Sequence, residues 1–195
     1  MKWVCVLPAV LLMLFGCAAA QQLSDEQQEL SRTYYHLADA QMRLGEYAEA
    51  AWSYRRALEI DRDLHSAAYN LSVAYAQIGS YRQALDELNR LLDIDSSNTL
   101  LLRRKAWCLL QLDRPDEAEA VYRRALEVDP GDREIQLNLA QLLLEQGALA
   151  EARERILDLS AQQGPDETLL RMLYDIDEQA HDRTGIIWLE ESWRL

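Results

Sequence analysis

Apolar residues recur along this chain three and four positions apart, in short runs that are typical of amphipathic helices. Tyr34, Leu37 and Ala38 fall three and four residues apart, which predicts a helix that ends before Gly45. A second helical run starts near Tyr47 and ends around residues 60–61. Residues 31–64 are therefore predicted to form a helix, a tight turn and a second helix.

The same pattern returns every 34 residues without an insertion. Residues 34 positions apart occupy the same place in successive repeats, and each such set is called a column. Five columns hold similar residues: Gly45, Gly79, Asp113 and Gly147; Ala38, Ser72, Ala106 and Ala140; Ala50, Ala84, Ala118 and Ala152; Tyr54, Leu88, Tyr122 and Ile156; and Ala57, Leu91, Ala125 and Leu159. A fixed period of this length is typical of one supersecondary unit stacked on copies of itself. It predicts an all-α solenoid of antiparallel helix pairs from about residue 25, wound as a right-handed superhelix.

At these residues the chain resembles the tetratricopeptide repeat, a helix–turn–helix unit of the same length. The best match is residues 65–98, which carry Leu71, Ser72, Tyr75, Gly79, Tyr81, Ala84, Leu91 and Ile94 in the family's key places, and Pro130 supplies the family's terminal proline in the next unit. Four units are assigned, residues 31–64, 65–98, 99–132 and 133–166. The resemblance implies a scaffold that binds other proteins and has no enzymatic activity.

Two departures and one shared feature refine the predicted helices. Lys105 stands where other units have leucine, so its alkyl stem could pack while the ammonium reaches water. Pro115 suits the first turn of a helix. Residues in one column precede successive helix starts and are good N-caps: Asn98, Asp132 and Asp166.

The region after the fourth unit predicts a degenerate fifth unit, residues 167–195, that caps the solenoid. A helix is expected from Glu167 to about Gln179, with Leu170, Leu173 and Tyr174 on one face. A short last helix is expected from about Arg183, and it carries Ile186, Leu189 and Trp193.

The first residues predict export and a lipid anchor. A basic residue, Lys2, precedes an apolar run that is too short to span a bilayer but suits a signal peptide. The segment 14–17, Leu-Phe-Gly-Cys, resembles the lipobox of bacterial lipoproteins, which implies a signal peptide of residues 1–16 and lipidation of Cys17. Residues 17–24 then form a short tether, and Ser24 with Gln27 has capping-box spacing before a helix that starts at Asp25.

In the sorting pattern of enterobacterial-type lipoproteins, which this segment resembles, a residue other than aspartate after the cysteine, here Ala18, implies the outer membrane, facing the periplasm. The alternative is an ordinary secretory signal that is cut near residues 18–20, with secretion into the periplasm. The lipoprotein interpretation is favoured because the small residue and the cysteine follow the aliphatic residue at the right spacing.

Charge and residue types exclude several functions. A net charge of −13 argues against nucleic acid as a partner, since that affinity rests on Lys and Arg. The three histidines, His36, His65 and His181, have no metal-ligand spacing, and neither a phosphate loop nor a catalytic motif is present. No enzyme activity, metal, cofactor or small-molecule substrate is therefore expected. Cys108 is expected to be a buried free thiol.

The family resemblance implies that the first helix of each unit lines a concave groove that holds a protein or peptide segment. The expected groove residues are Tyr35, Asp39, Tyr69, Asn70, Val73, Arg103, Arg104, Trp107, Asn138 and Gln141. The family's carboxylate clamp, which grips the C-termini of other polypeptides, is only partly matched, so that clamp is not predicted. Arg103 and Arg104 belong to the longest basic run of an acidic sequence, and they could instead pair with acids of the next unit such as Glu134.

The predicted function is a lipid-anchored interaction scaffold in the bacterial envelope that assists assembly of a pilus or secretion complex. The protein resembles outer-membrane lipoproteins of this build, the pilotins and Tad-type pilus assembly factors. The alternative is an adaptor for outer-membrane protein assembly or for peptidoglycan enzymes. If the groove does not bind the partner protein, the next candidate for the binding surface is the apolar C-terminal segment around Ile187, Trp188 and Trp193.

Replacement of Cys17 by serine tests the lipid anchor. The Cys17→Ser variant should leave the membrane fraction and lose palmitate labelling, because stable anchoring needs the acyl chains that only the thiol can carry. Membrane fractionation and labelling of the two proteins are the measurements. A serine variant that still fractionates with the outer membrane and still labels would contradict the lipobox assignment.

Overall fold

The computed structural model describes residues 23–180 of the 195-residue chain. The predicted signal peptide, Cys17, most of the tether and the expected helix from Arg183 lie outside these residues. The helices of the described part are α2 (Asp25–Leu44), α3 (Tyr47–Ile60), α4 (His65–Gln77), α5 (Tyr81–Ile94), α6 (Thr99–Gln111), α7 (Pro115–Val128), α8 (Arg133–Glu145), α9 (Leu149–Gln163) and α10 (Glu167–Ala180). No strand occurs among them, so the all-α prediction is confirmed.

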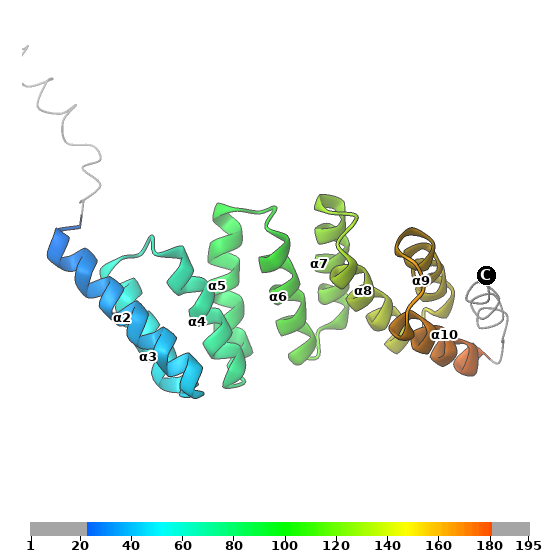
Figure 1. Cartoon of the computed structure of the whole chain (residues 1–195), viewed down its shortest axis with the longest axis horizontal. Helices are drawn as coiled ribbons and strands as arrows, with labels where there is room; N and C mark the ends of the chain where they lie inside the picture. Colours follow the sequence, from blue (N-terminus) through cyan, green and yellow to red (C-terminus); the bar gives the residue numbers. More distant parts are fainter. Residues whose placement is uncertain (1–22, 181–195) are drawn as a thin grey trace, which may run out of the picture. The chain divides into compact units, whose positions relative to one another are not determined.

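The structure divides into two compact units, with the division between Ala67 and Ala68 in the first turn of α4. Each is described by itself. The N-terminal unit contains α2 and α3, and the C-terminal unit contains the rest of α4 and the helices up to α10. Figure 1 shows α5 to α10 following one another side by side within the C-terminal unit.

In the N-terminal unit, small residues allow α2 and α3 to pack closely. Ala38, Ala50 and Ala57 are 0 % exposed, and the ring of Tyr54 fills the space beside them at 1 % exposure. Ser31 Oγ donates to the carbonyl oxygen of Ala57 at 3.0 Å, which satisfies a hydroxyl in this contact. The small-residue columns of the sequence therefore mark the buried contact between helices.

The start of α2 is capped as predicted. The backbone N–H of Gln27 donates to Ser24 Oγ at 3.2 Å, and the backbone N–H of Ser24 donates to Gln27 Oε1 at 3.0 Å. This reciprocal pair satisfies two N–H groups that have no partner within the helix. It places the first residue of the helix at Asp25, as the spacing indicated.

In the C-terminal unit, the predicted caps and turns hold the helix pairs in register. The side chains of Asn98, Asp132 and Asp166 each accept a backbone N–H three residues ahead, at 3.2, 3.0 and 3.0 Å. Pro115 occupies the first turn of α7. Gly79 and Gly147 have φ of 74° and 77°, and Asp113, in the same column, is the one described non-glycine residue with a positive φ, 56°.

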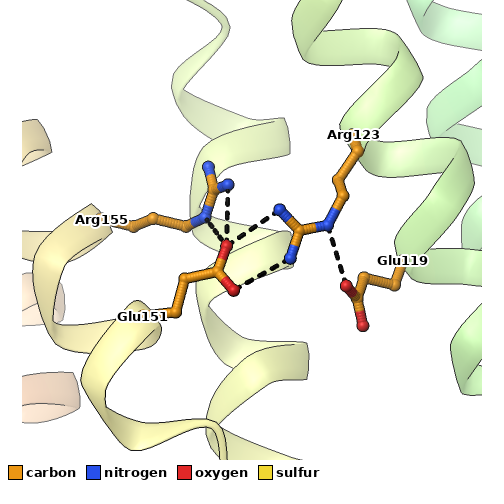
Figure 2. A network of polar contacts seen from close by, with 4 residues as sticks. All are labelled: Glu119, Arg123, Glu151 and Arg155. Atoms are coloured by element: carbon orange, nitrogen blue, oxygen red, sulfur yellow. Dashed lines mark hydrogen bonds and ion pairs between the residues drawn. The ribbon is translucent and has the colours of Figure 1, made fainter.

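Ion pairs in the C-terminal unit join helices of neighbouring repeats. Figure 2 shows one of them: Arg123 of α7 lies 2.9 Å from Glu151 of α9, and Glu119 and Arg155 extend the network. Hydrogen bonds from Arg123 hold the pKa of the Glu151 carboxyl below its usual value. Arg103 of α6 pairs with Glu134 of α8. These contacts join α7 to α9 and α6 to α8, and Arg153 of α9 pairs with Asp177 of the following helix, α10.

One expectation about a packed face was wrong. Tyr174 is 53 % exposed, because the stripe that packs from α10 is Leu169, Leu173 and Ile176 at i, i+4 and i+7, all 0 % exposed. Leu37, whose spacing helped to predict the first helix, lies in that helix but is 45 % exposed.

The column of small residues at Ala84 generates a stability prediction. Ala84→Trp should lower the free energy of unfolding by about 3 kcal/mol, because Ala84 is 0 % exposed and leaves no room for an indole. The control is Ala120→Trp, at an exposed alanine of α7, which should stay within about 0.5 kcal/mol. Thermal and urea unfolding of the three proteins are the measurements, and equal effects of the two substitutions would contradict close packing at Ala84.

Candidate functional site

The candidate residues of the N-terminal unit, Tyr35 and Asp39, are both held by Tyr54. They stand four residues apart on α2, and both are half-buried. Asp39 accepts a hydrogen bond from the hydroxyl of Tyr54, and the ring of Tyr35 lies 5.8 Å from the ring of Tyr54. The two side chains therefore contribute to α2–α3 packing, and a binding role for them stays a prediction.

The candidate residues of α4 in the C-terminal unit are Tyr69, Asn70 and Val73. All three are half-buried. The next residues along this helix, Leu71 and Ser72, are 1 % and 3 % exposed. The expected face of α4 is thus the one that keeps contact with solvent, while its neighbours enter the core.

The stripe of α6 formed by Leu100, Arg103, Arg104 and Trp107 carries the clearest surface feature of this unit. These residues follow the i, i+3, i+4, i+7 spacing of one helix face. Leu100 is 41 % exposed and Trp107 is 38 % exposed. The Trp107 ring makes a T-shaped contact with Tyr81, with 5.6 Å between the ring centroids, while part of the indole faces solvent.

The two arginines of this stripe have different roles. Arg103 pairs with Glu134, so the alternative of ion pairing with the next repeat is confirmed for Arg103. Arg104 is exposed and forms no ion pair or hydrogen bond within residues 23–180. Its charge is therefore available to an acidic group from another molecule.

On α8, Asn138 is half-buried and Gln141 is exposed. Gln141 donates to Glu145 one turn further along the helix at 2.9 Å. Both residues lie on the face of α8 that also carries Glu134, at i+4 and i+7 from it. Because Glu134 reaches Arg103 of α6, this face of α8 lies beside the α6 stripe.

Three residues that form or support the exposed surfaces were missed by reasoning from the sequence. Leu100 extends the α6 stripe by one turn, and its i−7 spacing from Trp107 is a signal that was available. Tyr81 supports Trp107 from the start of α5, a contact between helices that spacing within one helix does not show. Trp52 of α3 lies outside the predicted surface altogether.

Trp52 and its neighbours form a second surface, in the N-terminal unit. Trp52 is 52 % exposed, its ring meets Tyr34 at 6.0 Å, and the guanidinium of Arg56 lies 5.8 Å from the Trp52 ring. An open depression of about 330 Å³ is lined by Gln41, Ala48, Glu49 and Trp52. The sequence does contain a signal for this surface. The residues equivalent to Trp52 in the other repeats are Asp86, Ala120 and Glu154, so a tryptophan at this position is unusual.

The described residues show neither a metal cluster nor a membrane span. No group of three His, Cys, Asp or Glu side chains within residues 23–180 is placed to hold a metal ion. In the same part of the sequence no helix combines the length and apolar composition that crossing a bilayer requires.

Two family models, both described as tetratricopeptide repeat, match the sequence. One covers residues 79–128 and 109–174, and the other covers residues 35–99. Together they span well over half of the 195 residues. The chain belongs to the tetratricopeptide-repeat family. No curated protein matches the sequence.

Solved tetratricopeptide-repeat structures share the fold at low identity. A repeat protein from Parabacteroides merdae is 22 % identical with a TM-score of 0.68 over 83 % of this chain, and the match spans only 63 % of that protein. YrrB, described as having an unusual peptide-binding site, is 22 % identical with a TM-score of 0.57 over 81 % of this chain and 90 % of its own. The first repeat domain of Spaghetti (RPAP3), bound to the HSP90 peptide SRMEEVD, is 22 % identical with a TM-score of 0.55 over 63 % of this chain and 95 % of its own.

Membership of the family gives the broad function. Tetratricopeptide-repeat proteins are protein–protein interaction scaffolds, and the fold is generally non-enzymatic. The surfaces described above are therefore candidate contact surfaces for other proteins.

Cys108, on the core side of α6, generates a chemical prediction. It is 2 % exposed, and burial raises the pKa of its thiol to about 11, against the opposing charge of Arg104. At pH 8 the native protein should alkylate slowly at Cys108 and the unfolded protein rapidly, since the thiolate is the reactive form. Peptide mapping after iodoacetamide treatment is the measurement.

The raised pKa of the Cys108 thiol also determines how the stability of the protein changes with pH. Between the ordinary thiol pKa and about 11, the unfolded protein loses the Cys108 proton while the native protein keeps it, so this group makes the free energy of unfolding fall as pH rises. Cys108→Ala should reduce that fall. Rapid alkylation of Cys108 in the native protein would contradict both statements.

Proposed function

We propose that this protein is a lipid-anchored scaffold of the bacterial envelope that binds a segment of another envelope protein. The binding surface is formed by the exposed faces of α4, α6 and α8 in the C-terminal unit. A lipid on Cys17 holds the scaffold on the periplasmic face of the outer membrane. The setting we propose is the assembly of a pilus or secretion complex.

The observation that carries this proposal is the α6 stripe. It exposes two large apolar side chains, Leu100 and Trp107, on either side of Arg104. Exposed Trp and Arg anchors usually provide most of the energy of a protein interface. Trp107 is already oriented by Tyr81, so binding costs little side-chain entropy.

The neighbouring side chains suit a peptide ligand. Asn138 and Gln141 carry amides that can donate to and accept from a peptide backbone. Arg104 suits a carboxylate, and the planar guanidinium can bind both of its oxygens. Support for a peptide comes from the relatives, since one is bound to an HSP90 peptide and another has a peptide-binding site.

The anchor and the setting rest on the sequence. The lipobox-like segment at 14–17 supports the lipid, and Ala18 supports the outer membrane. With the first helix starting at Asp25, only about eight residues separate the lipid from the fold, roughly 26 Å when fully extended. The pilus setting is supported by the resemblance in build to pilotins and Tad-type assembly factors.

The test is capture of envelope proteins by the tagged full-length protein and by two sets of variants. Tyr69→Ala/Trp107→Ala removes the aromatic anchors, and Arg104→Glu reverses the free charge. Each should reduce capture of the wild-type partners roughly tenfold, the effect of losing one strong anchor. Quantitative mass spectrometry of the captured proteins is the measurement.

Matched controls separate binding from folding and from general charge. Tyr174→Ala removes an exposed aromatic on α10, and Arg82→Glu reverses an exposed arginine on α5. Both should capture partners at the wild-type level, and all variants should keep wild-type helical ellipticity. Full capture by the α4 and α6 variants would move the binding surface elsewhere. Partners from barrel assembly or cell-wall hydrolysis, in place of pilus or secretion subunits, would overturn the proposed setting.

A further inference from the structure

A row of three exposed leucines runs along α2 in the N-terminal unit. Leu30, Leu37 and Leu44 are 47 %, 45 % and 73 % exposed. They stand seven residues apart, so they form one nearly straight stripe about 21 Å long on the 20-residue helix. Apolar residues repeated every seven positions occupy one heptad position, which is one half of the pattern found where two helices pair.

The centre of this row, Leu37, is more exposed than its counterparts in the other repeats. Leu71 and Leu139, which share the column of Leu37, are 1 % and 0 % exposed. The helix α2 also starts six residues earlier in the repeat than α4, α6 and α8 do, and this extension supplies Leu30. The position of Leu37 is thus buried in the second and fourth repeats, half-buried at Lys105 in the third, and open in α2. The position of Leu44 is exposed in the second repeat too, where Ile78 is 42 % exposed.

The charges beside the stripe are arranged for self-association. Glu29 and Arg43 lie next to Leu30 and Leu44, on the same flank of the helix, and both are exposed. Neither forms an ion pair within the described part of the protein. They are fourteen residues apart, about 21 Å along the helix, so they cannot pair with each other in one molecule.

We propose that α2 pairs antiparallel with α2 of a second copy of this protein through the row of leucines. With Leu37 on the two-fold axis, Leu30 meets Leu44 of the second copy and the same contact forms again at the other end. Glu29 then lies beside Arg43 of the second copy, twice in each dimer. An isologous contact of this kind closes after two copies.

A different partner fits the stripe less well. A bilayer surface would attract an anchored protein through basic residues, but this sequence has a net charge of −13. An identical antiparallel helix matches all three leucines and both charges at once. The pairing does not involve the proposed binding surface of α6, so it stands independently of the proposed function.

The test uses disulfide cross-linking of the full-length protein in cell extracts. Leu37→Cys should give a covalent dimer well above the background of the parent protein. Leu30→Cys and Leu44→Cys should each cross-link weakly alone and strongly when two differently tagged proteins that carry one change each are mixed. Strong cross-linking of Leu30→Cys with itself would show a parallel pair and overturn the arrangement.

A charge swap in the Leu37→Cys background decides whether the contact is specific. Glu29→Arg and Arg43→Glu should each lower the yield of dimer roughly tenfold, because each replaces two attractions by two repulsions in every dimer. The double variant Glu29→Arg/Arg43→Glu should restore the yield. All variants should keep the wild-type circular dichroism spectrum. Absence of a dimer from Leu37→Cys, or no recovery in the folded double variant, would overturn the proposal.

Discussion

The close approach of two helices within each repeat is the constraint on which the rest of the structure depends. It is made possible by one column of alanines, Ala50, Ala84, Ala118 and Ala152, each 0 % exposed. A methyl side chain lets the backbones come close enough for larger neighbours such as Tyr54 and Tyr122 to fill the remaining space. This contact also fixes how far each first helix is rotated about its axis. The exposed stripe of α6 therefore follows from the alanines on the opposite side of the contact.

The turn between the paired helices is the second requirement, and one repeat meets it in a different way. Gly45, Gly79 and Gly147 adopt a left-handed conformation, and Asp113 adopts the same conformation with a Cβ. Aspartate tolerates this region better than most residues because its short polar carboxylate can hydrogen-bond locally. The third repeat therefore keeps the turn geometry at a small cost in backbone strain, and Pro115 compensates by setting the first turn of α7.

Much of the fold could be predicted from the sequence, since its signals are local. The capping box at Ser24, the caps at Asn98, Asp132 and Asp166, and the left-handed turns all involve residues within a few positions of one another. The misplaced residues were those whose environment depends on another helix. Spacing puts Leu37 and Tyr174 on a helix face, but whether that face is covered depends on the neighbour.

The candidate site was less predictable for the same reason. Columns of the repeat placed Arg103, Arg104 and Trp107 on one helix face. They could not show that Glu134 of the next repeat engages Arg103, or that Tyr81 supports Trp107. Long side chains form contacts with residues of other helices. For this reason Arg103 and Arg104, which are adjacent in one basic segment, lie in different environments. Only the pattern of contacts separates a structural arginine from an available one.

The difference between structural and available arginines also changes how the net negative charge of the protein is interpreted. Part of the acid is not a passive solvated surface, since Glu134, Glu151 and Asp177 each bind an arginine of another helix. Asp177 is nearly fully buried, so its partner Arg153 is required to offset the cost of removing a carboxylate from water. Arg103, Arg123 and Arg153 are therefore committed to holding helices together. Among the exposed arginines that form no ion pair within residues 23–180, Arg104 on α6 and Arg43 on α2 are the informative ones. Each lies beside exposed apolar side chains, and this combination of free charge and uncovered apolar surface is what a second polypeptide would satisfy.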